Sequence, residues 1–196
     1  HQSLMKDLIK HIFFLFFLTY SSIFFSEGEH KIFNLGDFFL ESGVVLPEAK
    51  LSYVTHGKLN KEKNNLIVVP SAYLGDHHGF DFLIDKGKAL DPNKYFIVAT
   101  DMFQNGLSSS PSNTEPPFNG PNFPLISTRD NVNAGYRLVT EVFKVKEIYG
   151  VVGFSMGAQQ AFQWGVSYPD FVKKIVGIAG SAVEYPHGIV RLEGFI

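Results

Sequence analysis

The chain of 196 residues contains no cysteine. That absence excludes a disulfide framework, a thiolate zinc site and a cysteine nucleophile. Charged residues make up only 18% of the sequence, and 17 basic against 19 acidic residues give a net charge of −2 with no basic run. A nucleic-acid-binding surface needs concentrated positive charge, so we expect no nucleic-acid partner. Hydrophobic residues, at 45%, are enough to build the core of one globular domain.

The sequence also lacks the usual spacings of metal ligands. His77 and His78 are adjacent, with Asp76 and Asp81 close by, but no HxxxH or HExxH pattern occurs. Neighbouring histidines in a loop seldom point at one ion. We therefore expect no bound metal, and we expect these histidines to line the entrance of a substrate pocket.

The N-terminus carries a short apolar run. Residues 12–18 read Ile-Phe-Phe-Leu-Phe-Phe-Leu, after a weakly basic stretch that starts at Met5 and before small polar residues. A spanning helix needs about 20 apolar residues, so this order fits a secretory signal peptide better. We assign residues 1–26 to a signal-peptide-like or anchor segment and 27–196 to the catalytic fold. The expected location is outside the cytoplasm, periplasmic or secreted, with a cytoplasmic protein as the alternative, and membrane contact is expected only through residues 12–25.

Apolar runs that alternate with helical stretches follow this segment. Four continuous runs, typical of strands buried on both faces, occupy residues 65–70, 95–100, 148–152 and 174–179. Their alternation with helices predicts an α/β fold with a doubly wound, mostly parallel sheet.

The residues before these runs predict an antiparallel edge to the sheet. Residues 38–40 and 44–46 predict a hairpin, and residues 49–55 predict a further strand. A helix that begins near Thr128 is expected between the second and third buried runs, with Asp130 as an N-terminal cap or first-turn acid and not as a catalytic acid.

One long segment, residues 103–127, has no regular pattern and is rich in Asn, Gly, Ser and Pro. Loops longer than about 15 residues inside a compact domain are usually functional or disordered. This one leaves the carboxyl end of a buried strand, where ligands bind in such sheets. We expect it to form a wall of the active site.

The pentapeptide Gly153-Phe154-Ser155-Met156-Gly157 lies between an apolar strand and a helix-like stretch. In this setting a G-x-S-x-G sequence is typical of the nucleophile elbow of α/β-hydrolases. Gly153 and Gly157 lack the Cβ atoms that would collide across so tight a turn. The turn directs the Met156 N–H and the positive end of the next helix at the space in front of Ser155. The pattern predicts Ser155 as nucleophile and Met156 as one oxyanion donor.

The second oxyanion donor is expected in residues 71–76, directly after the first buried strand. In α/β-hydrolases a backbone amide at this position completes the oxyanion hole, and we assign the role to the N–H of Tyr73. Leu74, Phe154 and His78 are the residues expected to shape the pocket.

Residues 153–160, followed by Trp164 and the Tyr168-Pro169-Asp170 turn, resemble the homoserine O-acetyltransferase family of α/β-hydrolases. Further matching stretches are residues 53–60, Ala72, Gly75-Asp76, His78, residues 87–91 and Tyr95-Phe96, within a resemblance that runs from Asn34 to Ala182. The resemblance implies a serine acyltransferase without a bound cofactor. Ser155 would take an acyl group from acetyl-CoA or another acyl-CoA as cosubstrate and pass it to the hydroxyl of a small molecule; a homo-oligomer is compatible with this.

The chain departs from that family at both predicted halves of the oxyanion hole. The family usually has Ala-Leu-Thr-Gly and Gly-Gly-Ser-Met-Gly-Gly, where this chain has Ala72-Tyr73-Leu74-Gly75 and Gly153-Phe154-Ser155-Met156-Gly157-Ala158. This indicates a divergent branch with a reshaped pocket, and the acceptor is left open.

The acid and histidine of a triad follow the serine in this fold. After Ser155 the acids are Asp170, Glu184 and Glu193, and the histidine is His187. Asp170 follows the helix after Ser155 and lies at the end of the next strand that is opposite to the elbow. His187 lies too few residues after Ser155 to be the catalytic histidine of the family. We therefore predict that this chain is the amino-terminal part of an α/β-hydrolase domain, or the product of an interrupted gene.

Three functions stay open at this point. The first is acyl transfer to a hydroxyl acceptor. The second is hydrolysis of an ester or thioester by the same serine, with water as the acceptor. The third is non-catalytic binding by a truncated hydrolase fold.

Overall fold

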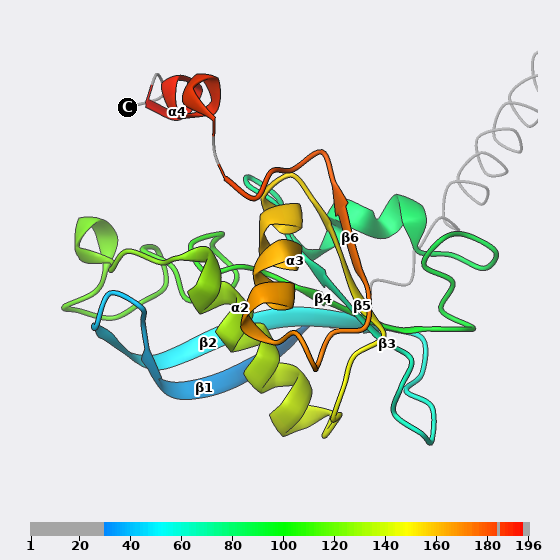
Figure 1. The fold of residues 1–196 in the computed structure, drawn as a ribbon. Helices are drawn as coiled ribbons and strands as arrows, with labels where there is room; N and C mark the ends of the chain where they lie inside the picture. Colours follow the sequence, from blue (N-terminus) through cyan, green and yellow to red (C-terminus); the bar gives the residue numbers. More distant parts are fainter. Residues whose placement is uncertain (1–29, 184, 194–196) are drawn as a thin grey trace, which may run out of the picture.

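The computed structural model describes residues 30–183 and 185–193, so the predicted segment 1–26 lies outside the described residues. A six-stranded mixed sheet with the strand order β1-β2-β4-β3-β5-β6 forms its centre (Figure 1). The strands are β1 Lys31–Phe39, β2 Val45–His56, β3 Leu66–Pro70, β4 Phe96–Thr100, β5 Gly150–Phe154 and β6 Ile175–Ile178. The helices are η1 His77–Leu83, η2 Gly120–Asn122, α2 Thr128–Arg137, η3 Leu138–Val142, α3 Met156–Ser167 and α4 Pro186–Glu193.

The antiparallel edge is made of two strands and not three. β1 pairs with β2, and β2 pairs antiparallel with β4, as the hairpin pattern predicted. The expected break between residues 46 and 49 is wrong, because β2 continues through it. Glu48 adopts a φ of 47° beside the irregular pairing at Gly36, so a bulge absorbs the irregularity without ending the strand.

The remaining strands are parallel, which confirms the doubly wound sheet. β3 pairs with β4 on one side and with β5 on the other, and β6 follows β5. The chain therefore moves from β3 to β4 and then crosses to the opposite side for β5. A crevice at the carboxyl ends of the strands, near such a reversal, is where open α/β sheets bind ligands.

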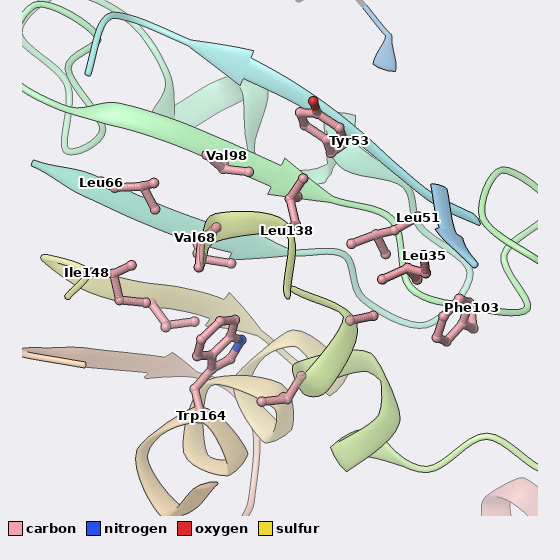
Figure 2. Packing of buried hydrophobic residues seen from close by; sticks show 14 of the residues in the cluster. Leu35, Leu51, Tyr53, Leu66, Val68, Val98, Phe103, Leu138, Ile148 and Trp164 are labelled. Carbon is pink, nitrogen blue, oxygen red and sulfur yellow. The ribbon is translucent and has the colours of Figure 1, made fainter. Parts of the chain in front are cut away.

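Helices α2 and α3 pack together on one face of the sheet (Figure 1). The largest fully buried side chain is Trp164, which lies under β3 and β5 together with Val68 and Ile148 (Figure 2). The opposite face is covered by η1 through Phe80 and by Leu90. Helix α4 lies apart from the sheet (Figure 1).

Helix α2 begins as the sequence predicts. The Ser127 side chain caps it by accepting from the Asp130 N–H, and the Asp130 carboxylate accepts from the Ser127 N–H in return, which confirms Asp130 as a first-turn acid. Asp130 also accepts from the N–H of Glu41, which lies in the turn between β1 and β2, at 2.8 Å. Within the described residues, no helix is both long and apolar enough to cross a membrane.

Candidate active site

Ser155 occupies the sharp turn between β5 and α3. Its φ of 52° and ψ of −119° place a non-glycine residue in a sparsely populated, strained conformation. The turn is held by the Ser155 N–H, which donates to the carbonyl of Ile178 at 2.9 Å, and by the Ser155 carbonyl, which accepts from Ala158. Strain at a residue fixed from both sides is what a nucleophile elbow requires.

Gly153 has the steric role that the sequence predicts, whereas Gly157 makes room for the neighbouring strand β3 and not for the turn itself. A Cβ on Gly153 would lie 2.0 Å from the carbonyl oxygen of Gly157, and a Cβ on Gly157 would lie 2.7 Å from that of Pro70. Sequence reasoning missed a third such glycine: a Cβ on Gly180 would lie 2.6 Å from the carbonyl oxygen of Ser155. Three independent close approaches of backbone to backbone therefore define the elbow.

Residues 71–76 form a tight turn beside the elbow. The Gly75 N–H donates to the Ala72 carbonyl at 3.0 Å, and of the two central residues only Leu74 has a positive φ, 58°. This is the pattern of a type II turn, in which the first central residue is Tyr73. In the part of the chain that the structure describes, no acceptor pairs with the Tyr73 N–H, and the Met156 N–H precedes the first hydrogen bond of α3. Both amides are thus available to an incoming oxygen.

A cavity of about 640 Å³ lies between this turn, the elbow and the segment 103–127. Its lining is Tyr73, Leu74, Gly75, Asp76, Met102, Phe103, Gln104, Asn105, Leu107, Ile126, Ser127, Thr128, Asn131 and Met156. The irregular segment therefore supplies a wall of the cavity, where the sequence placed it.

Of the five residues predicted to form the oxyanion hole and the pocket, three line this cavity. They are Tyr73, Leu74 and Met156. Phe154 is 46% exposed and is not part of the lining. His78 also lies outside the lining, and its ring pairs with Asp81 at 2.7 Å.

The cavity is mostly apolar and carries almost no charge. Its polar side chains are hydroxyls and amides, with Asp76 as the one charged residue in the lining and neither lysine nor arginine among the lining residues. A ligand with phosphate or carboxylate groups would find no cationic partner on these walls. The cavity therefore fits a small neutral molecule better than an anion.

Asp101, which directly follows β4, joins several of the segments around the cavity and was missed by sequence reasoning. Its side chain is fully buried and accepts from the His77 N–H at 2.8 Å, from Asn105 Nδ2 at 3.1 Å and from Ser52 Oγ at 2.6 Å. The ring nitrogen Nδ1 of His77 lies 2.8 Å from the same carboxylate. An acid directly after a buried strand was the available signal, because that position lies at the carboxyl edge of the sheet.

His77 is therefore not an entrance residue. Its side chain is buried against Asp101, and its ring lies between those of His30 and His78, at centroid distances of 5.4 and 4.3 Å. His56 lies near this group, and burial lowers the pKa of its imidazole from the usual 6.5, with the Asp81 carboxylate opposing that shift. Within residues 30–183 and 185–193 no three potential ligands lie where they could hold a metal ion.

The described residues bring no base to the nucleophile. Among residues 30–183 and the described side chains of residues 185–190, none is a hydrogen-bond partner of the Ser155 hydroxyl. Asp170 lies in the turn between α3 and β6, at the end of β6 remote from the elbow. Glu184 and the side chains of His187 and Glu193 lie outside what the structure describes.

Comparison with known proteins identifies the fold family. A family model described as the alpha/beta hydrolase fold matches residues 65–196. The chain belongs to the α/β-hydrolase family. Esterases and acyltransferases of this family generally need no cofactor.

Among curated members of the family, an ethyl acetate hydrolase from Pseudomonas veronii is 42% identical over 169 residues, which cover 86% of this chain and 48% of the relative. The solved structure of the acetyl esterase MekB superposes with a TM-score of 0.82 at 42% identity, over 85% of this chain and 48% of that one. A homoserine O-acetyltransferase from Methanosalsum zhilinae is 38% identical over 76% of this chain and 34% of the relative. The chain thus spans half or less of the length of these relatives. The homoserine O-acetyltransferase is a homologue, and the ethyl acetate hydrolase and the acetyl esterase are more similar to this chain than it is.

Proposed function

We propose that this protein is a serine carboxylester hydrolase that acts on small neutral esters such as acetate esters. The observation that carries the proposal is the cavity beside the elbow, which has apolar walls, amide and hydroxyl groups and no cationic side chain in its lining. The more similar relatives, an ethyl acetate hydrolase and an acetyl esterase, are named for neutral esters and support the same reaction.

The elbow supplies the nucleophile for this reaction. Ser155 Oγ attacks the ester carbonyl carbon, and the carbonyl oxygen gains the negative charge between the amides of Met156 and Tyr73. Collapse of this intermediate breaks the bond to the alcohol, which leaves with a proton, and an acyl group remains on Ser155. Water then attacks the acyl carbon and releases the carboxylic acid.

The proposal requires a general base within hydrogen-bond reach of Ser155 Oγ, because serine at its free pKa is a poor nucleophile. In this fold the base is a histidine that follows the serine in the chain. The base would come from residues outside those that the structure describes.

Acyl transfer to a hydroxyl is the second candidate, favoured by the 38% identity to a homoserine O-acetyltransferase. It would share the acyl-enzyme and differ only in the acceptor. The cavity disfavours it in one respect: acyl-CoA carries phosphates and homoserine carries a carboxylate, and the lining offers Asp76 as its charged group. A negative group there repels the phosphates of acyl-CoA and offers the carboxylate of homoserine no partner.

The test compares acceptors and donors on the purified protein. We expect turnover of p-nitrophenyl acetate and ethyl acetate that is lost in Ser155→Ala. Acetyl-CoA should be turned over less efficiently by about 100-fold or more, the factor that about 2.8 kcal/mol of lost binding would give. Acetyl-CoA turnover that rises with added homoserine would instead establish the transferase. Binding of esters without turnover by the full-length protein would establish the non-catalytic alternative.

A further inference from the structure

The turn that carries Tyr73 is anchored at both ends by buried side chains. At its start, Ser71 donates its N–H to the Thr100 carbonyl at 2.9 Å, and its carbonyl accepts from Gln160 Nε2 at 2.8 Å. At its end, His77 is held by Asp101. The five residues between these anchors have one internal backbone hydrogen bond, from Gly75 to Ala72.

The anchor at His77 is the stronger of the two. Asp101 contacts His77 through both the backbone N–H and the ring Nδ1, each at 2.8 Å. A buried carboxylate only accepts hydrogen bonds here, so Nδ1 carries the proton and the contact is charge-assisted, which roughly doubles its strength. The same carboxylate is itself fixed by Ser52 from β2 and by Asn105 from the cavity wall.

We propose that the Asp101–His77 pair is a positioning device that holds the Tyr73 amide in place for the developing oxyanion. The inference rests on the proposed function and adds two residues that act through a third. Neither Asp101 nor His77 lines the cavity, so neither reaches the substrate. Their effect travels along the turn, whose far end is fixed to α3 by Gln160.

The first part of the test is a double-mutant cycle that combines two substitutions. Tyr73→Pro removes the amide, and proline suits the first central position of a type II turn, so the backbone is retained. His77→Phe keeps the aromatic ring that packs against His30 and His78 and removes the ring donor.

Loss of one oxyanion donor costs about 10²- to 10³-fold in kcat, so we expect that loss for Tyr73→Pro. A donor that is displaced but still present costs only part of this loss. We therefore expect kcat to fall about 10-fold in His77→Phe, with KM changed less than about twofold. The double variant is expected to match Tyr73→Pro alone. His77→Asn should recover most of kcat, because its side-chain NH2 group is the same number of bonds from Cα as Nδ1 of histidine and can donate to Asp101 in its place.

Additive losses in the double variant would overturn the proposal, because the pair would then act by a route other than Tyr73. An unchanged kcat in His77→Phe would overturn it as well. If His77→Phe does not fold, Asp101→Asn supplies the same cycle, because it keeps the size of the side chain and removes the charge that strengthens the contact with His77.

The second part of the test does not depend on turnover. Hydrogen exchange of the backbone amides in residues 71–77 is expected to accelerate in His77→Phe and to stay near the parent rate in His77→Asn. Equal exchange in all three proteins overturns the positioning role, whether or not they hydrolyse esters. Failure of the proposed function alone would appear as a parent protein without turnover whose exchange still depends on His77.

Discussion

Replacement of Gly157 by alanine tests the geometry of the elbow against a control in the same helix. Gly157 and Gly165 both belong to α3, so Gly→Ala at either position brings the intrinsic helix preference of alanine, up to about 1 kcal/mol. Their surroundings differ. A Cβ at 157 would lie 2.7 Å from the carbonyl oxygen of Pro70, whereas a Cβ at 165 would lie 2.3 Å from Cδ1 of Ile175.

The shorter of these two contacts, at position 165, costs less free energy to relieve. The methyl group of Ile175 ends a flexible side chain that is 39% exposed, so it can rotate away from a methyl group added at position 165. The Pro70 carbonyl is fixed in β3 and cannot move away in this manner. To bring the added Cβ at position 157 to an ordinary distance of 3.4 Å from its oxygen, the start of α3 must move from the sheet by more than half an ångström. Overpacking of this kind typically costs about 1–3 kcal/mol.

We therefore expect Gly157→Ala to be about 1–3 kcal/mol less stable than Gly165→Ala in urea unfolding followed by circular dichroism. We also expect kcat for p-nitrophenyl acetate to fall about 10- to 100-fold in Gly157→Ala only, because the Met156 amide moves with the helix start. Equal stability and equal kcat in the two variants would refute the steric account of the elbow.

Three further predictions concern stability. Trp164→Ala empties the largest buried site and should lower the free energy of unfolding by about 3–5 kcal/mol; circular dichroism must report it, since this is the chain's single tryptophan. Asp130→Ala removes the capping box and leaves the Glu41 N–H unpaired, so urea unfolding should show a loss of about 2–3 kcal/mol. Because the pKa of His56 is lowered in the folded protein, the unfolded chain binds the proton more tightly than the folded protein does. The free energy of unfolding should therefore fall as the pH drops below 6.5, and His56→Gln should flatten that dependence of Tm between about pH 5 and 7.5. An equal slope in both proteins would contradict the last prediction.

The parts of the site that the sequence predicted are those with local causes. The elbow follows from the spacing of Gly153, Ser155 and Gly157, and the contact that Gly153 avoids is made within the turn itself, with the carbonyl of Gly157. The buried strands follow from continuous apolar runs, and the start of α2 follows from Asp130, an acid of the kind favoured in the first turn of a helix.

The parts that it missed depend on contacts between distant segments. Asp101 meets His77 across 24 positions and Ser52 across 49, and only the assembled sheet brings these residues together. The sequence contains no metal-ligand spacing at His77 and so predicts an entrance residue, but the carboxylate of Asp101 makes its burial favourable. The continuity of β2 was missed because a positive φ at Glu48 has no sequence signal comparable to glycine.

Intact-mass analysis after treatment with a fluorophosphonate shows whether Ser155 is the nucleophile of an ester hydrolase. We expect one adduct per chain, mapped by peptide sequencing to Ser155, absent in Ser155→Ala and prevented by excess ethyl acetate. A chain that gains no adduct, or that gains it at another residue, would contradict this role.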